Sequence, residues 1–299
     1  MMAVDVRRPE WIKVRLPGGD HYADLVGIMR TQQVHTVCEE ARCPNIGECW
    51  GRRTATFLIL GNVCTRRCGY CAIAHGLPTE LDAAEPGRVV DAVVAMGLRH
   101  AVITSVNRDD QKDGGAGIYA ETIRAIHGRL PACTVEVLIP DFKGDPVALH
   151  TVLEANPEIL AHNIEAPRRV FKTVRGGGYF DRSLELLRRA KEWGYTSFTK
   201  SSIILGMGET SEEILETMDE LRAVDCDVLT LGQYLRPGPD HHPIARYYTP
   251  EEFAALREEG LRRGFQYVES GPLVRSSYRA DIQAQAVRAH RARFGAASV

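Results

Sequence analysis

The chain has 299 residues and a mass of 33.2 kDa, with 44% hydrophobic residues, 25% charged residues and a formal net charge of -2. This composition excludes an intrinsically disordered chain, and no apolar run approaches the ~20 residues of a bilayer helix, so we expect no membrane span. The near-neutral charge argues against a nucleic-acid partner held by phosphate contacts. The first residues lack the apolar core of a secretory signal, which predicts a cytoplasmic protein.

From about residue 54, short β-branched runs alternate with amphipathic segments of helical period. Runs that are apolar throughout suit parallel strands covered on both faces. We predict six strands, at 54–61, 100–106, 134–140, 159–165, 196–205 and 228–234. Helices are expected between them, at 87–97, 117–130 and 181–193, and after the capping residues Thr210 and Thr249.

Strands that alternate with helices imply βαβ units and a parallel sheet, either open and doubly wound or curved into a complete or partial barrel. In both architectures, functional residues gather at the carboxyl ends of the strands. The segments that follow the predicted strands are unusually polar, which indicates a lined pocket: 104–110, 140–143, 163–165, 206–209 and 233–234.

The flanks of this repeat show no helix–strand repeat of their own. We therefore expect an N-terminal extension over residues 1–53, a barrel over 54–263 and a C-terminal extension over 264–299. Both extensions are predicted to cover the barrel mouth.

Six of the eight cysteines form two triplets, Cys38-x4-Cys43-x5-Cys49 and Cys64-x3-Cys68-x2-Cys71. The other two, Cys133 and Cys226, are expected in the core. Three thiolates leave one position of an iron–sulfur cluster open, which is a catalytic arrangement. The alternative is a zinc module completed by His35, His75, His241 or His242, although these cysteine spacings lack the paired motifs of zinc sites.

The second triplet, in the setting CTRRCGYC at 64–71, resembles the CxxxCxxC signature of the radical S-adenosylmethionine (radical SAM) superfamily. The first triplet, in CEEARCPNIGECW at 38–50, resembles the auxiliary-cluster motif of the lipoyl synthases, and this pairing is far more specific. The resemblance runs from Pro9 to Asp281 and includes RSSY at 275–278. Related enzymes with auxiliary clusters, such as biotin synthases and methylthiotransferases, place their extra ligands elsewhere.

The resemblance implies an α/β fold with a partial (β/α)6 TIM-like barrel. It also implies a [4Fe–4S] cluster that binds S-adenosylmethionine at its open iron and is held by Cys64, Cys68 and Cys71. A second [4Fe–4S] cluster is implied on Cys38, Cys43, Cys49 and one serine of the RSSY motif. We place that ligand at Ser277, with Ser276 as the alternative.

The same resemblance implies a sulfurtransferase of lipoate biosynthesis. No side chain can deprotonate an unactivated alkyl carbon, so a radical is required. The implied substrate is an octanoyl-lysine on a lipoyl carrier domain or on the glycine-cleavage carrier protein. Two molecules of S-adenosylmethionine are consumed as sulfur from the second cluster enters at C6 and C8. The implied electron donor is flavodoxin or ferredoxin.

Further candidates for binding the cofactor or substrate are Tyr70, Thr104, Ser105, Asn107, Asn163, Glu165, Lys200 and Gln233. The resemblance places Tyr70 near the adenine, and places the segment 104–107 where superfamily members hold the methionine amino group. Asn107 stands where the family leads us to expect an aspartate. For the last four candidates the alternative is mutual hydrogen bonding and salt bridging. Gly176-Gly177-Gly178 is expected to form a turn, because it lacks the P-loop lysine and does not follow a strand.

Overall fold

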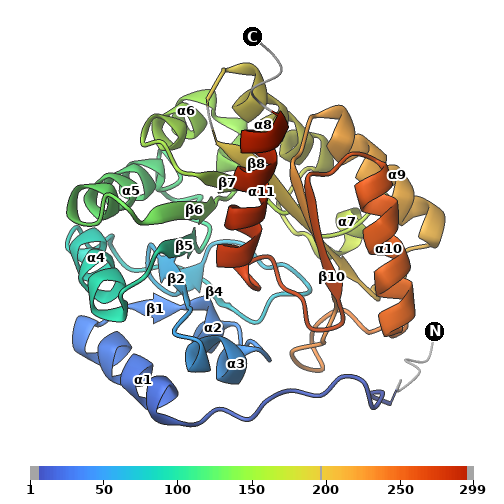
Figure 1. Cartoon of the computed structure of the whole chain (residues 1–299), viewed down its shortest axis with the longest axis horizontal. Coiled ribbons are helices and arrows are strands. Elements are labelled where there is room, and N and C mark those ends of the chain that lie inside the picture. Colours follow the sequence, from blue (N-terminus) through green and yellow to red (C-terminus); the bar gives the residue numbers. More distant parts are fainter. Residues whose placement is uncertain (1–6, 196, 295–299) are drawn as a thin grey trace.

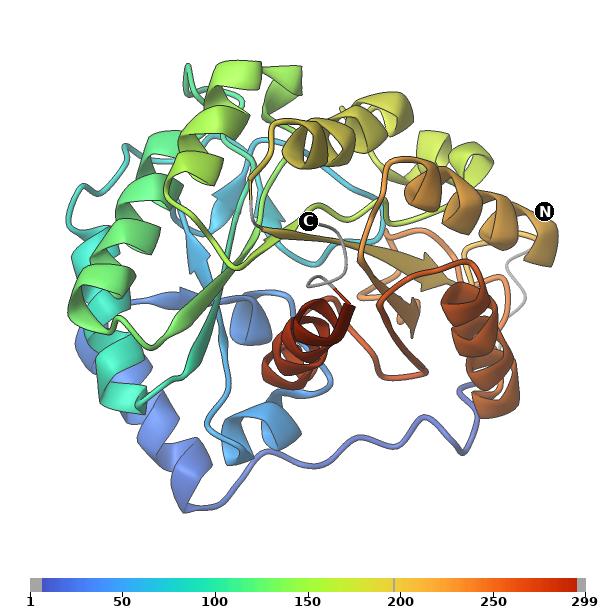
Figure 2. The same ribbon diagram turned by 45° about the horizontal axis from the view of Figure 1, so that its top comes forward.

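The computed structural model describes residues 7–195 and 197–294. Its main sheet has eight strands in the order β1-β2-β5-β6-β7-β8-β9-β10, in which β1 alone is antiparallel to its neighbour. The strands are β1 His35–Thr36, β2 Thr56–Ile59, β5 His100–Ser105, β6 Thr134–Leu138, β7 Ile159–Ala161, β8 Phe198–Leu205, β9 Val228–Gln233 and β10 Tyr267–Gly271. The sheet curves without closing (Figures 1 and 2), which confirms the predicted partial barrel.

The six predicted strands correspond to β2 and β5 to β9. The helices that follow these strands lie outside the curved sheet (Figure 1), as right-handed crossovers require. They are α4 Glu85–Met96, α5 Ala116–Arg129, α6 Pro146–Glu154, α7 Arg168–Val174, α8 Phe180–Glu192, α9 Ser211–Ala223 and α10 Pro250–Arg262. A short 3-10 helix, Phe142–Gly144, follows β6.

The two predicted caps are present as complete capping boxes. The Thr210 side chain accepts from the backbone N–H of Glu213, and the Glu213 carboxylate accepts from the backbone N–H of Thr210. Thr249 and Glu252 do the same at α10, where Pro250 occupies the first turn. Each box satisfies backbone donors that a helix start leaves unpaired, so these helices begin at defined residues.

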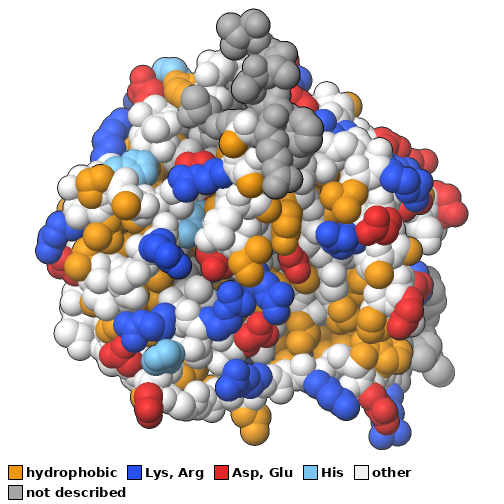
Figure 3. Space-filling view, in the orientation of Figure 1, with side chains coloured by type: hydrophobic (Ala, Val, Ile, Leu, Met, Phe, Trp, Pro, Cys, Tyr) orange, Lys and Arg blue, Asp and Glu red, His pale blue; other side chains and the backbone are white. Residues whose placement is uncertain are grey.

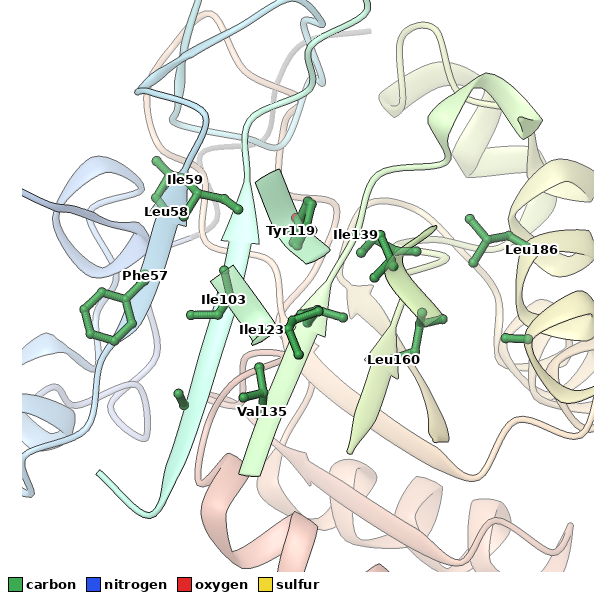
Figure 4. Close-up of a cluster of buried hydrophobic side chains, with 14 of the residues drawn as sticks. Phe57, Leu58, Ile59, Ile103, Tyr119, Ile123, Val135, Ile139, Leu160 and Leu186 are labelled. Carbon is green, nitrogen blue, oxygen red and sulfur yellow. The ribbon is translucent and has the colours of Figure 1, made fainter. Parts of the chain in front are cut away.

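The core lies between the sheet and the outer helices. Figure 4 shows Ile103 of β5 and Val135 of β6 beside Ile123 of α5, and all three side chains are fully buried. Cys133 and Cys226 are also buried, as predicted. Strands covered on one side by helices and on the other by the barrel interior need apolar residues on both faces, which explains their continuous apolar runs.

The C-terminal segment differs from the prediction in two ways. Residues 267–271 form a seventh parallel strand, β10, paired with β9, so the sheet continues past residue 263. Helix α11 (Ala280–Phe294) does not cover the barrel mouth. Its Ala284 and Val287 pack on Ile159, Phe198 and Val228, the first residues of β7, β8 and β9, so α11 closes the opposite end of the barrel (Figures 1 and 2).

On the face that carries α11, positive and negative side chains are interspersed (Figure 3), as expected for a chain with little net charge. Within the described residues, no helix has both the length and the apolar character needed to cross a membrane.

Gly232 of β9 provides a test of this packing. A Cβ atom built at Gly232 would lie 2.0 Å from the carbonyl oxygen of Val274, so Gly232→Ala must displace the segment that follows β10. We expect this variant to lower the free energy of unfolding by about 1–3 kcal/mol, with faster hydrogen exchange at 272–278. The matched control is Gly87→Ala in α4, where a Cβ atom would meet nothing within 4 Å. Equal stability of the two variants would contradict this packing.

Candidate active site

A cavity of about 770 Å³ lies at the carboxyl ends of the parallel strands. Cysteines from both triplets line it: Cys38 and Cys43 from the first, and Cys64, Cys68 and Cys71 from the second. Ser276 and Ser277 line the same cavity. Three segments that are far apart in the sequence therefore meet at one cavity.

The second triplet lies on a loop that begins at Cys64, the last residue of β3 (Val63–Cys64), and precedes β4 (Ala74–His75). Backbone hydrogen bonds hold this loop from two sides. The N–H of Gly69 donates to the carbonyl of Val174 at 2.7 Å, and the N–H of His242 donates to the carbonyl of Gly69 at 2.8 Å. On the Val174 side, the predicted turn at 176–178 approaches closely, because a Cβ atom at Gly176 would lie 2.9 Å from the Arg67 carbonyl.

A buried arginine ties the same loop to the barrel. Arg66 donates to both carboxylate oxygens of Asp109, at 2.6 and 2.9 Å, and to Asp141 at 2.7 Å. Asp109 follows β5 and Asp141 follows β6, so one guanidinium joins the cysteine loop to two strand ends. Bidentate pairs of this kind fix geometry as well as charge.

The pH dependence of stability tests this ion pair. Burial alone would raise the pKa of Asp141, but the hydrogen bond and charge of Arg66 outweigh it and lower the pKa to about 2. A lowered carboxyl pKa stabilises the fold above the unfolded value near 4 and loses that effect as the pH falls towards 2.

We therefore expect the difference in unfolding free energy between the iron-free protein and Asp141→Asn to be about 2 kcal/mol at pH 7 and to shrink between pH 4 and pH 2. Asp91→Asn, at an exposed position, is the control. Urea titrations at each pH measure both, and a difference for Asp141→Asn that does not change with pH would exclude this role for the pair.

Cys38 and Cys49 of the first triplet lie on two short helices, α2 (Val37–Glu40) and α3 (Ile46–Gly51), and Cys43 lies between them; both helices follow α1 (Asp20–Gln32). Side chains tie them to the segment after β10. Asn45 donates to the carbonyl of Leu273 at 2.6 Å, and the Tyr278 hydroxyl donates to Glu48 at 2.9 Å. The Thr56 hydroxyl donates to Ser277 Oγ at 2.8 Å. The N-terminal and C-terminal extensions thus hold each other beside the cavity.

Burial and mutual repulsion keep these thiols neutral in the metal-free protein. Burial and then the neighbouring Cys43 raise the pKa of Cys38 to about 11. Burial, with Cys38 and Cys43, raises the pKa of Cys49 to about 12. Cys49 does not line the cavity, but it lies close enough to the other two thiols for them to raise its pKa. A bound cation would reverse this preference and release protons.

The donors fit iron–sulfur clusters better than single ions. All eight cysteines are free, and among the described residues no three His, Cys, Asp or Glu side chains form a group that could hold a metal ion. A zinc module needs four ligands around one ion, so this geometry disfavours the zinc alternative. The thiolates of an iron–sulfur cluster lie further apart than the ligands of one ion, because each thiolate binds a different iron.

Most of the other predicted site residues also line the cavity, namely Tyr70, Thr104, Ser105, Asn107, Asn163, Glu165 and Gln233. Two of their buried polar atoms, Ser105 Oγ and Asn163 Oδ1, have no hydrogen-bond partner within the described part of the chain. The Thr104 hydroxyl donates to the Leu138 carbonyl, and the backbone N–H of Asn107 donates to Cys64 Sγ at 3.3 Å. Buried polar atoms are normally paired, so the two unpaired ones indicate a ligand site.

Glu165 lies inside the cavity in the left-handed backbone region, at φ 69. Burial raises its pKa, and the nearby Arg175 guanidinium opposes that shift. Arg175 also donates to the Asn163 carbonyl, and its charge opposes the rise in pKa that burial causes at Cys68. Arg275 lies beside Cys43. Neither Arg175 nor Arg275 was predicted from the sequence as a site residue. The available signals were the adjacent glycine triplet and the RSSY motif.

Gln233 and Lys200 have other partners. The Gln233 amide donates to three backbone carbonyls and accepts from the N–H of Tyr248, so its hydrogen-bonding capacity is used within the protein. Lys200 does not line the cavity. Its ammonium donates to Glu136 at 2.7 Å, and both side chains are at most 1% exposed. For Lys200 the structure therefore supports the alternative of a salt bridge.

Removing one member of this buried pair should be costly. We expect Lys200→Met to lower the free energy of unfolding by about 3–5 kcal/mol, because the buried Glu136 carboxylate would keep only His100, 3.5 Å away, as a partner. The double variant Lys200→Met/Glu136→Met should recover most of the loss. As a control, Arg188→Met removes a partly exposed arginine that pairs with Glu185 and Glu192, and it should cost less than about 1 kcal/mol. Equal losses for the two single variants in urea unfolding would contradict the burial of this pair.

Comparison with known proteins gives the family. The sequence profile of the radical SAM superfamily matches residues 58–221, and that of the N-terminal domain of lipoyl synthase matches residues 3–43. The lipoyl synthase of Symbiobacterium thermophilum is 58% identical, with 98% of this chain and 91% of the relative covered. The lipoyl synthase of Rubrobacter xylanophilus is also 58% identical, covering 94% of this chain and 88% of the relative.

Solved structures agree on the fold. Methylornithine synthase superposes with a TM-score of 0.52 at 14% identity, covering 71% of this chain and 70% of that one. HydG, a maturase of the [FeFe]-hydrogenase, gives 0.55 at 13% identity, covering 71% and 55%. At these identities the likeness concerns the fold alone. Taken with the sequence relatives, the chain belongs to the lipoyl synthase family of the radical SAM superfamily.

Proposed function

We propose that this enzyme inserts sulfur at C6 and C8 of a protein-bound octanoyl-lysine, giving lipoyl-lysine, at the cavity that both cysteine triplets line. As a lipoyl synthase it uses S-adenosylmethionine and [4Fe–4S] clusters. The observation that carries the site assignment is the convergence of Cys38, Cys43 and the loop 64–71 on one cavity of about 770 Å³. Radical formation and sulfur donation at one substrate require the two centres to face the same space.

We assign the two clusters to the two triplets. Cys64, Cys68 and Cys71 would hold the cluster that binds S-adenosylmethionine, and Cys38, Cys43 and Cys49 would hold the second with Ser277. Bound there, these groups supply hydrogen abstraction by an adenosyl radical and the inserted sulfur. The protein supplies the walls of the cavity: residues of both extensions line it together with the strand ends, although α11 takes no part.

The unpaired polar atoms suit the methionine part of S-adenosylmethionine. Ser105 Oγ and Asn163 Oδ1 can accept from an ammonium group, while Arg175, inside the same cavity, can bind a carboxylate. Thr104, Asn107 and Tyr70 lie beside them as wall residues. Gln233 and Lys200 are proposed as supports of the barrel, since each is fully engaged with other groups.

The partners follow from the reaction. The substrate is an octanoyl-lysine on a lipoyl carrier domain or on the glycine-cleavage carrier protein, and a flavodoxin or ferredoxin supplies electrons. The reduced thiols that the clusters need agree with a cytoplasmic enzyme.

Anaerobic incubation with an octanoyl-lysine peptide, S-adenosylmethionine and dithionite tests the function. Mass spectrometry should show an octanoyl chain with two added sulfur atoms. Cleavage of S-adenosylmethionine with an unchanged octanoyl chain would assign a different substrate.

Adjacent serines allow a matched test of the second cluster. Ser277→Ala should lower the iron content below about eight atoms per chain, because one iron of the second cluster would lose its protein ligand, while Ser276→Ala should retain about eight. Ser277→Cys should keep the iron but slow sulfur insertion, because thiolate binds iron–sulfur clusters more firmly than the harder serine oxygen. Loss of iron in Ser276→Ala instead would assign the ligand to Ser276. Normal turnover in Ser277→Cys would refute the idea that a weakly bound serine ligand favours release of sulfur from the second cluster.

A further inference from the structure

The arginines of this protein differ in whether they pair with carboxylates, according to where they lie. Over the outer surface most of them pair with carboxylates, as Arg168 does with Asp181 and Glu220. Around the cavity, four exposed arginines have no carboxylate partner within the described part of the chain. We refer to Arg8, Arg42, Arg67 and Arg236 as the arginine rim.

The rim is built from four separate segments. Arg8 precedes α1, Arg42 lies between α2 and α3, Arg67 lies on the cysteine loop, and Arg236 follows β9. Arg236 donates to the backbone carbonyls of Pro239 and His241, which leaves its charge uncompensated. Convergence of like charges from four directions is not a consequence of composition, because the chain carries a net charge of -2.

Few acidic groups oppose these charges. Of the residues that line the cavity, two are acidic, and Glu165 lies inside it while Asp240 is exposed. Two further arginines lie deeper, Arg175 beside Cys68 and Arg275 beside Cys43, where they suit anionic groups held within the cavity. The exposed rim arginines face outward and remain available to a partner. Patches of one sign attract partners of the opposite sign and accelerate their association.

We propose that the arginine rim is the docking surface for an acidic face of the carrier, in which Asp and Glu residues flank the octanoyl-lysine. This inference rests on the proposed function, because the acyl-lysine must enter the cavity from its opening. The arm is a single lysine side chain and an eight-carbon acyl group, so the carrier surface around it comes to the rim. An electron donor is less favoured, since it need not occupy the opening itself.

The test measures binding of an octanoylated lipoyl carrier domain to the anaerobic holoenzyme over a series of salt concentrations. The variant is Arg8→Glu/Arg42→Glu. We expect the wild-type Kd to rise with salt, and the variant Kd at low salt to be at least about tenfold higher with a flatter salt dependence. Arg8→Gln/Arg42→Gln should shift the Kd in the same direction by less. The matched control is Arg124→Glu, an exposed arginine of α5 that does not line the cavity.

Reversing the charges on the carrier distinguishes a loss of docking from a general disturbance of the site. A carrier with lysines in place of the carboxylates that flank its octanoyl-lysine should bind the wild type weakly and Arg8→Glu/Arg42→Glu more tightly. Unchanged iron content in each variant shows that the clusters are retained.

Three results would overturn the proposal. If the double variant binds the acidic carrier as tightly as the wild type does, the rim is not the docking surface. Sulfur insertion by the wild type would then show that the proposed function still holds. Slower reduction by flavodoxin with unchanged carrier binding assigns the rim to the electron donor. Absence of sulfur insertion by wild-type enzyme into the octanoylated carrier would reject the function itself, whatever the binding data.

Discussion

Two sets of three thiols have to meet at one cavity, which five of them line, and the other features of this structure make that possible. The second triplet lies on the loop before β4, whereas the first lies on and between the short helices α2 and α3 ahead of the barrel. Neither helix α2 nor α3 exceeds two turns, so their positions depend on tertiary contacts. Those contacts come from the opposite end of the chain, through the hydrogen bonds of Asn45 to Leu273 and of Tyr278 to Glu48.

Charge inside the barrel serves two separate purposes. Lys200 and Glu136 lie in the interior with no access to solvent, and their pairing supports the fold without reaching the cavity. Arg66 connects the cysteine loop to two strand ends through Asp109 and Asp141. The position of the cysteine loop is thus fixed by the buried ion pairs of Arg66, which specify geometry more than they add stability.

Local sequence patterns predicted the parallel strands and the capped helices, because burial on both faces and capping boxes act over a few residues. They did not predict β10, whose YVESG sequence is only partly buried and lacks a continuous apolar run. The place of α11 depends on Ala284 and Val287 meeting three distant strand starts, which no local pattern records. For the same reason, polarity near the strands could not distinguish Asn163, which follows β7 and lines the cavity, from Lys200, which lies within β8 in the core.

The central claim is that both cysteine triplets hold iron–sulfur clusters that face a single cavity. Anomalous diffraction at the iron edge, from crystals of the anaerobically prepared enzyme, tests it most directly. We predict two iron clusters, one ligated by Cys64, Cys68 and Cys71 and the other by Cys38, Cys43 and Cys49, with the cavity between them. Iron at one triplet alone, or zinc at either, would contradict the claim.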